Sequence, residues 1–168
     1  MPYWHFRLRD VSLEKALGWA LRTSAPNRLL FPMRLAEGRG KKRFAPPGVE
    51  DNIKRVFEKY ILESFWASQW PGTQLFEHKG RVWILEFSEE VKALVLKTQP
   101  IFAMWHNNSL LPEDICVFRE GNRSPTLLSV THEGDGWFFS RDKPRMPKLR
   151  QDQKLEEFIP SGKYFCYR

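Results

Sequence analysis

The feature that most constrains the fold is a series of tight turns between residues 73 and 140. Residues 77–80, 120–123 and 133–136 each carry Gly or Asn where the chain has to reverse. These two residue types adopt positive φ more readily than others, as tight reversals between antiparallel strands require. Aromatic and β-branched segments separate the turns. The sequence therefore predicts successive hairpins, and hairpins build an antiparallel β-sheet.

The expected sheet has about five or six strands. Its members are the two strands of a hairpin over residues 74–87 and strands in residues 101–106, 115–119, 126–132 and 137–140, and a separate opening strand is expected in residues 4–9. A strand-like segment recurs at residues 164–167, after a short helical patch near residues 155–159. Together with the helices described next, this pattern predicts the α+β class, with the sheet packed against two or three α-helices.

Apolar residues at helical spacing mark two helices before the sheet. The first is a stripe with Asp10 or Ser12 as its cap, formed by Leu13, Ala16, Leu17, Ala20 and Leu21. The second is expected over residues 49–69, ended by Trp70-Pro71-Gly72. The end of this second helix carries apolar residues outside its main apolar face, namely Leu62, Phe65 and Trp66. Its last turns are therefore expected to be enclosed on several sides or to meet a partner. A third, short helix is expected after Ser88.

A chain of 168 residues has the length of one domain. We therefore expect a single domain over residues 1–168, with a helical N-terminal part (1–71), a sheet-rich part (72–168) and an exposed basic loop at about 36–48. The N-terminal sequence lacks a signal-peptide pattern, and no apolar stretch is long enough to span a membrane. The two cysteines, Cys116 and Cys166, lack metal-site spacing and are expected to be packed thiols, a single disulfide being the alternative. These features favour a cytoplasmic protein.

Two polar clusters invite a catalytic interpretation. One is His132-Glu133-Gly134-Asp135, and the other surrounds His106. A zinc site needs more ligands than either cluster supplies, and Glu, Gly and Asp also suit the tip of a hairpin. The chain carries no HExxH, nucleophile-elbow or phosphate-loop motif. We therefore expect no metal and no cofactor, and a hydrolase centred on His106 and His132 ranks third among the functions considered.

The net charge of +7 favours acidic partners without selecting among them. Basic residues gather in two clusters, residues 39–43 and residues 141–150. The residues expected to contact a partner are Arg39, Lys41, Lys42, Arg43, Arg141, Lys143 and Arg145. Flexible cations neutralise phosphates, and nearby aromatic side chains would offer stacking surfaces. A nucleic-acid-binding protein that uses both clusters is therefore the second hypothesis.

The favoured hypothesis is a non-catalytic module that binds another protein. Its contact surface would be the loop that carries residues 39–43, together with neighbouring exposed aromatic residues. A small α+β protein of this general form is similar to small prokaryotic or phage accessory and inhibitor proteins, a similarity of fold type that covers no specific motif. The sequence leaves the partner and the oligomeric state open.

Overall fold

The computed structural model describes residues 3–22, 27–33, 36–37, 43–44, 48–74, 79–98, 114–120, 125–140 and 156–158. Within them the helical elements are α1 (Leu13–Leu21), α2 (Val49–Phe57), the 3-10 helix η2 (Glu58–Tyr60) and α3 (Glu89–Thr98). The strands are β1 (Tyr3–Arg7), β2 (Asn27–Met33), β3 (Ala36–Glu37), β4 (Arg43–Phe44), β5 (Ile61–Ala67), β6 (Gln69–Trp70), β7 (Thr73–Gln74), β8 (Gly80–Phe87), β9 (Cys116–Arg119), β10 (Pro125–Val130), β11 (Asp135–Phe139) and β12 (Glu156–Phe158).

Eight of these strands form one sheet in the order β12-β1-β11-β10-β9-β2-β8-β5, and every neighbouring pair in it is antiparallel. Two short hairpins, β3–β4 and β6–β7, stand beside it. The predicted α+β class with an antiparallel sheet is confirmed. The sheet exceeds the expected five or six strands because β2, β5 and β12 also belong to it, and residues 61–67 and 156–158 were expected to be helical.

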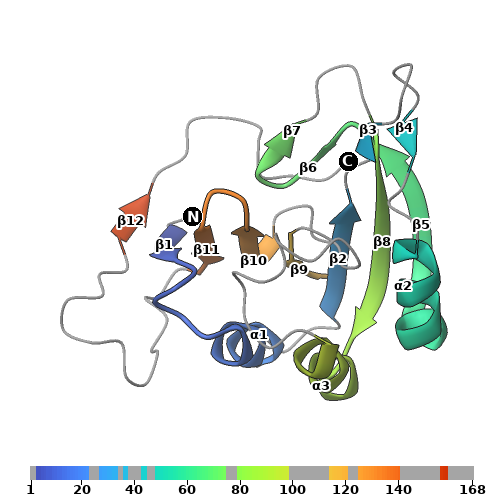
Figure 1. Ribbon diagram of the computed structural model, residues 1–168. Coiled ribbons are helices and arrows are strands. Elements are labelled where there is room, and N and C mark those ends of the chain that lie inside the picture. Colours follow the sequence, from blue (N-terminus) through green and yellow to red (C-terminus); the bar gives the residue numbers. More distant parts are fainter. Residues whose placement is uncertain are drawn as a thin grey trace.

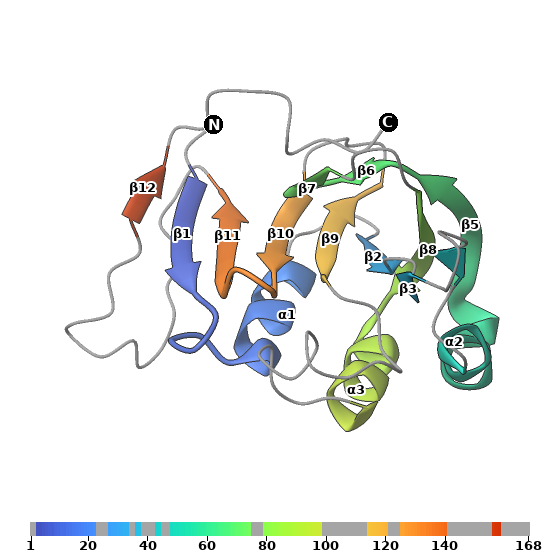
Figure 2. The same ribbon diagram turned by 45° about the horizontal axis from the view of Figure 1, so that its top comes forward.

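The three helices contribute to a core on one face of the sheet. Figures 1 and 2 show α1 and α3 next to each other along that face, with α2 near its β8–β5 end. Ala16 and Leu17 of α1, Val91 and Val95 of α3, and Phe57 of α2 are all buried in a single apolar cluster. The same cluster holds sheet residues such as Trp83, Leu127 and Phe138. This face is therefore the main hydrophobic core.

The opposite face of the sheet is also buried. A second cluster there contains Val82, Ile84, Cys116, Leu128 and Phe139, with Trp70 of the β6–β7 hairpin. Figure 1 shows that hairpin on the side of the sheet away from α1 and α3. Successive residues of one strand point to opposite faces, so β8 places Val82 and Ile84 in this cluster and Trp83 and Leu85 in the other. The central strands therefore carry apolar residues on both sides.

Serine caps begin α1 and α3 as expected. The Ser12 hydroxyl accepts a hydrogen bond from the Lys15 N–H at 3.2 Å, and the Ser88 hydroxyl accepts one from the Val91 N–H at 3.3 Å. Both contacts satisfy backbone donors that the first turn of a helix leaves free. The turn before β11 also follows the prediction, because Gly134 has φ +74°.

The helix predicted for residues 49–69 is much shorter. The α-helix ends at Phe57, η2 follows, and residues 61–67 form the strand β5. Pairing with β8 satisfies the backbone groups on one side of β5, and Phe65 packs against the second apolar cluster. Leu62, Phe65 and Trp66 did not fit the apolar face of a helix because they belong to a strand.

Other boundaries also need correction. The first 71 residues are not mainly helical, since β1, β2 and β5 all belong to the large sheet. The strand β8 pairs with β2 and β5, whereas β7 pairs with β6, so the hairpin expected over residues 74–87 does not form. Residues 36–37 pair with residues 43–44 within the expected basic loop. Residues 156–158 form a strand on β1 in place of a helical patch. The segments 101–106 and 164–167 lie outside the described residues.

Within the described part of the chain, no helix is both long enough and apolar enough to cross a membrane.

Gly136 provides a test of the packing between β1 and β11. It lies opposite Phe6, whose ring stacks on that of Phe138 with 4.5 Å between centroids. A methyl group at Gly136 would sit 2.7 Å and 2.9 Å from the ring atoms Cε2 and Cε1 of Phe6. We expect Gly136→Ala to lower the free energy of unfolding by about 1–3 kcal/mol through overpacking.

The control for Gly136→Ala is Gly18→Ala in α1, where the nearest atom to the added methyl group would be the Lys92 Nζ at 3.9 Å. This change should raise stability by up to about 1 kcal/mol, because alanine favours a helix over glycine. Urea denaturation measures both variants. An equal effect of the two substitutions would contradict this account of the β1–β11 contact.

Candidate functional site

The strand β5 forms one edge of the large sheet. No strand among the described residues pairs with its outer side. Leu62 and Trp66 of this strand are 49% and 43% exposed, and they are the large hydrophobic residues that the described part of the chain exposes. An unpaired edge with apolar side chains readily pairs with another chain, and native proteins usually protect such edges with charge or cover. This strand is therefore the first candidate for a contact surface.

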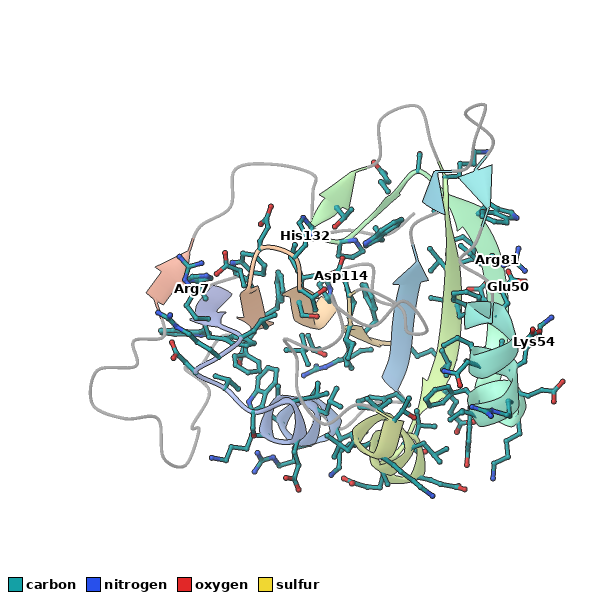
Figure 3. The ribbon with its side chains drawn as sticks, in the orientation of Figure 1. Arg7, Glu50, Lys54, Arg81, Asp114 and His132 are labelled. Carbon is teal, nitrogen blue, oxygen red and sulfur yellow. The ribbon has the colours of Figure 1, made fainter. Side chains whose placement is uncertain are left out.

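Arg81 of β8 holds β5 and α2 together. It lies opposite Trp66 in the sheet register, and its Cζ is 5.3 Å from the centroid of the Trp66 ring. Its Nη2 donates to the Ser64 hydroxyl at 2.7 Å, and its Nε lies 3.9 Å from the Glu50 Oε1 in the first turn of α2. Figure 3 shows Arg81 and Glu50 facing each other, with Lys54 farther along α2. The exposed indole of Trp66 thus packs against a guanidinium that also contacts Ser64 and Glu50.

We call the group of Leu62, Trp66, Arg81, Glu50 and Lys54 the β5 corner. Its residues come from the edge strand, from the neighbouring strand and from one side of α2, where Glu50 and Lys54 are one turn apart. Lys54 is exposed, and Arg81 has 26% of its side chain exposed. The β5 corner therefore combines apolar and cationic groups on one surface.

The basic segment predicted as a contact surface is attached at this corner by both ends. Strand β2 ends at Met33, which pairs with Arg81, and α2 begins at Val49, next to Glu50. Between these points, residues 34–47 carry five Arg or Lys residues and one Glu. Two of the intervening pairs, 36–37 and 43–44, form the β3–β4 hairpin. The described residues on either side of the segment, Met33 and Glu50, are therefore both close to Arg81.

Most of the predicted contact residues lie outside the described residues. These are Arg39, Lys41, Lys42, Arg141, Lys143 and Arg145. Arg43 has its backbone in β4. The use of residues 39–43 and 141–150 as one binding surface stays a prediction.

The proposed catalytic histidines are not brought together in the part of the structure that is described. His106 lies outside it, and His132 is in the exposed turn before β11, with its Nε2 3.8 Å from the Glu133 Oε1. Among the described residues no three His, Cys, Asp or Glu side chains are grouped as metal ligands would be. The hydrolase hypothesis therefore gains no geometric support from His132.

An acidic residue that the sequence did not single out is fully buried. Asp114 is fully buried at the start of β9. Its Oδ1 accepts hydrogen bonds from the backbone N–H of Thr131 at 2.8 Å and from the Thr131 hydroxyl at 3.1 Å. Its Oδ2 accepts from the Trp70 Nε1 at 3.2 Å and the Thr73 hydroxyl at 3.3 Å. The carboxylate thereby fixes the β6–β7 hairpin to the end of β10, close to His132 in Figure 3.

Cys116 lies two residues beyond Asp114 and carries a free, buried thiol. Burial raises the pKa of this thiol well above its usual value, and the nearby Asp114 carboxylate raises it further. Only the thiolate is a strong nucleophile. Cys116 is therefore an inert core residue, in agreement with the expectation of a packed thiol.

Asp135, which belongs to the polar cluster beside His132, ties β1 to β11. The Asp135 Oδ1 lies 2.8 Å from the His5 Nε2 and accepts a hydrogen bond from the Arg7 Nη1 at 2.6 Å. The register places Arg7 directly opposite Asp135. Such cross-strand pairs of opposite charge stabilise a sheet. Because 128 residues separate Arg7 from Asp135 in sequence, only the strand pairing reveals the contact.

The junction between η2 and α3 holds an exposed ion pair. The Lys59 Nζ lies 2.9 Å from the Glu90 Oε1. The Tyr60 hydroxyl and Lys59 lower the pKa of Glu90, while the Tyr60 hydroxyl and Glu90 raise the pKa of Lys59. Exposed pairs of this kind contribute little to stability. The negative charge of Glu90 balances the positive charge of Lys59 on this surface.

Comparison of the chain with protein-family models, with curated proteins and with solved structures finds no match.

Asp114 allows a direct test of its anchoring role. We expect Asp114→Asn to lower the free energy of unfolding by about 2–3 kcal/mol, because an amide nitrogen would face donors that now meet a carboxylate oxygen. Urea denaturation measures the change. The control, Asp51→Asn in the exposed first turn of α2, should cost less than about 1 kcal/mol. Equal losses for the two variants would contradict the proposed anchor.

The inertness of Cys116 is tested by its reaction with an aromatic disulfide reagent. In a Cys166→Ser protein, the native state should release almost no coloured thiolate, and one equivalent should appear after denaturation in guanidinium. The reason is that reaction needs an accessible thiolate, which burial of Cys116 disfavours. Rapid release of one equivalent from the folded protein would refute this expectation.

Proposed function

We propose that this protein is a non-catalytic module that binds another protein through the β5 corner. The observation that carries the proposal is the exposure of Leu62 and Trp66 on a strand edge that no described strand covers. Covering exposed apolar groups on a sheet edge lowers the free energy, and hydrophobic burial supplies most of the driving force of protein association. Aromatic and arginine side chains are also the usual anchors of protein interfaces.

The rigidity of the β5 corner supports the same proposal. Trp66 has few rotatable bonds, and the Arg81 guanidinium lies against its ring while also contacting Ser64 and Glu50. A side chain that is already restrained loses little conformational entropy when a partner covers it. The corner therefore has the properties of a preorganised anchor.

A second candidate function is the binding of single-stranded nucleic acid. It is favoured by one observation, that the basic residues 39–43 belong to a segment attached at both ends next to Trp66. An exposed indole offers a stacking surface for a base, and the cations would neutralise phosphates. The two candidates differ in their response to salt, which weakens phosphate contacts steeply and apolar contacts little.

The test compares the wild-type protein with a Leu62→Ser, Trp66→Ser double variant as tagged baits in a nuclease-treated lysate of the natural host. Because both side chains are exposed, the variant should fold normally, which circular dichroism would check. The proteins retained by the wild type are identified, and the affinity of the main one for each bait is measured by calorimetry. We expect the double variant to bind it at least about 10-fold more weakly, as hot-spot truncations do.

The control bait carries Lys97→Ser on an exposed position of α3 and should bind like the wild type. A protein partner held equally by the double variant would contradict the proposal. Material that is bound from an untreated lysate but from no nuclease-treated one would favour nucleic acid, and charge reversal at Lys41, Lys42 and Arg43 should then reduce the salt dependence of oligonucleotide binding.

A further inference from the structure

Trp66 and Arg81 form one continuous surface. The register places them directly opposite each other on β5 and β8, and partners of this kind project from the same face of a sheet. Ser64 and Trp83 are the next pair on that face, and Trp83 belongs to the main core under the helices. Trp66 and Arg81 therefore lie where the helix-covered face of the sheet ends and becomes exposed. One group of a partner can contact both side chains there.

The hydrogen-bond donors of Arg81 are only partly used. A guanidinium has five N–H donors. Among the residues that the structure describes, Arg81 makes its hydrogen bond from Nη2 to the Ser64 hydroxyl. Its Nε is buried without a hydrogen-bond partner in the described part of the chain, and the Glu50 Oε1 is too far from it at 3.9 Å. Because 26% of the Arg81 side chain is exposed, a further acceptor can reach the guanidinium from outside.

The charges around Arg81 favour a single negative group. Arg81 and Lys54 are positive and Glu50 is negative, and the exposed Lys54 makes no ion pair with the residues that the structure describes. One carboxylate would balance this excess, and its two oxygens match the planar donors of a guanidinium. The phosphates of a nucleic-acid strand would bring several negative charges close to Glu50, which is unfavourable. The acceptor that fits best is therefore one carboxylate.

We propose, on the basis of the protein-binding function inferred above, that the partner presents one carboxylate next to an apolar side chain. The carboxylate binds Arg81, and the apolar side chain covers the indole of Trp66, so both groups approach the same face of the sheet. Lys54 adds attraction for the same carboxylate. Glu50 limits the affinity, because its charge lies beside Arg81 and repels the incoming acid.

The probe is a random dodecapeptide library displayed on phage and selected on the full-length protein. The best binder is synthesised with an amidated C-terminus, together with variants in which each Asp or Glu in turn becomes Asn or Gln. Titration calorimetry measures every peptide against the wild type and against Glu50→Gln, Arg81→Gln, Lys54→Gln and Trp66→Ser. The control protein carries Lys97→Gln, at an exposed position of α3. Circular dichroism checks the fold of each protein.

On the peptide side, we expect the selected sequences to share one Asp or Glu beside an apolar residue. Conversion of that acid to its amide should weaken binding to the wild type at least about 10-fold, because a charge-assisted hydrogen bond is lost. The same conversion should have little effect on binding to Arg81→Gln, which lacks the guanidinium. Trp66→Ser should weaken the acidic and the amide peptide alike, at least about 10-fold.

On the protein side, Glu50→Gln gives the sharpest result. It should tighten binding of the acidic peptide about 3-fold or more and leave the amide peptide unchanged, because only the acid is repelled by Glu50. This variant keeps the proposal testable if Arg81→Gln fails to fold, since Glu50 is 41% exposed and its contact with Arg81 is longer than a hydrogen bond. Lys54→Gln should weaken the acidic peptide by less than Arg81→Gln does, and Lys97→Gln should change neither peptide.

Several outcomes would overturn recognition of a carboxylate by Arg81. They are failure to select any peptide, selection of peptides without an acid, equal binding of the acid and its amide, and no gain from Glu50→Gln. Concentration-dependent dimerisation that Trp66→Ser abolishes would instead identify a second copy as the occupant. Tighter binding of a poly-dT oligonucleotide than of any peptide would identify nucleic acid.

The two proposals can fail separately. If the lysate partner depends on Leu62 and Trp66 while the acid and the amide bind equally, the binding function stands and only the role given to Arg81 is wrong. If the lysate partner binds the Leu62→Ser, Trp66→Ser variant as well as it binds the wild type, the binding function itself is wrong.

Discussion

Burial of the sheet on both faces is the constraint on which the rest of the structure depends. The main core under the helices and the second cluster around Trp70 share the strands β8, β10 and β11, whose adjacent residues alternate between the two. The middle residues of these strands are therefore apolar on both faces, as Val82 to Leu85 of β8 are. The buried carboxylate of Asp114 is satisfied there by hydrogen bonds to both of its oxygens. Within the described part of the chain, the large exposed apolar side chains, Leu62 and Trp66, both belong to the edge strand β5.

The candidate contact surface is a consequence of this architecture. The chain reaches β5 directly from α2 and η2, and the pairing of β5 with β8 brings Trp66 opposite Arg81. Arg81 in turn contacts Glu50 of α2, and Met33 at the end of β2 pairs with it. Residues of β2, α2, β5 and β8 therefore meet around one guanidinium. A rigid apolar edge flanked by basic chain follows from that meeting, and it is the physical basis of the proposed binding function.

Two polar clusters stabilise the fold and are distinct from the contact surface. Asp114 connects the β6–β7 hairpin with β10, and Asp135 connects β1 with β11 through His5 and Arg7. Both carboxylates accept several hydrogen bonds, so their charge is compensated locally. Their positions in turns and at strand ends explain why acidic residues cluster there in the sequence without a catalytic role being required.

The sequence by itself determined the α+β class, the capped helices after Ser12 and Ser88, and the turn at Gly134, because each depends on contacts within a few residues. The ends of α2, the strand β5 and the sheet order were decided only by the tertiary structure. Residues 58–67 have apolar side chains that a helix and a strand can both bury, and the free energy gained by pairing with β8 selects the strand. The contact of Trp66 with Arg81 depends on that pairing, so local sequence could not predict it.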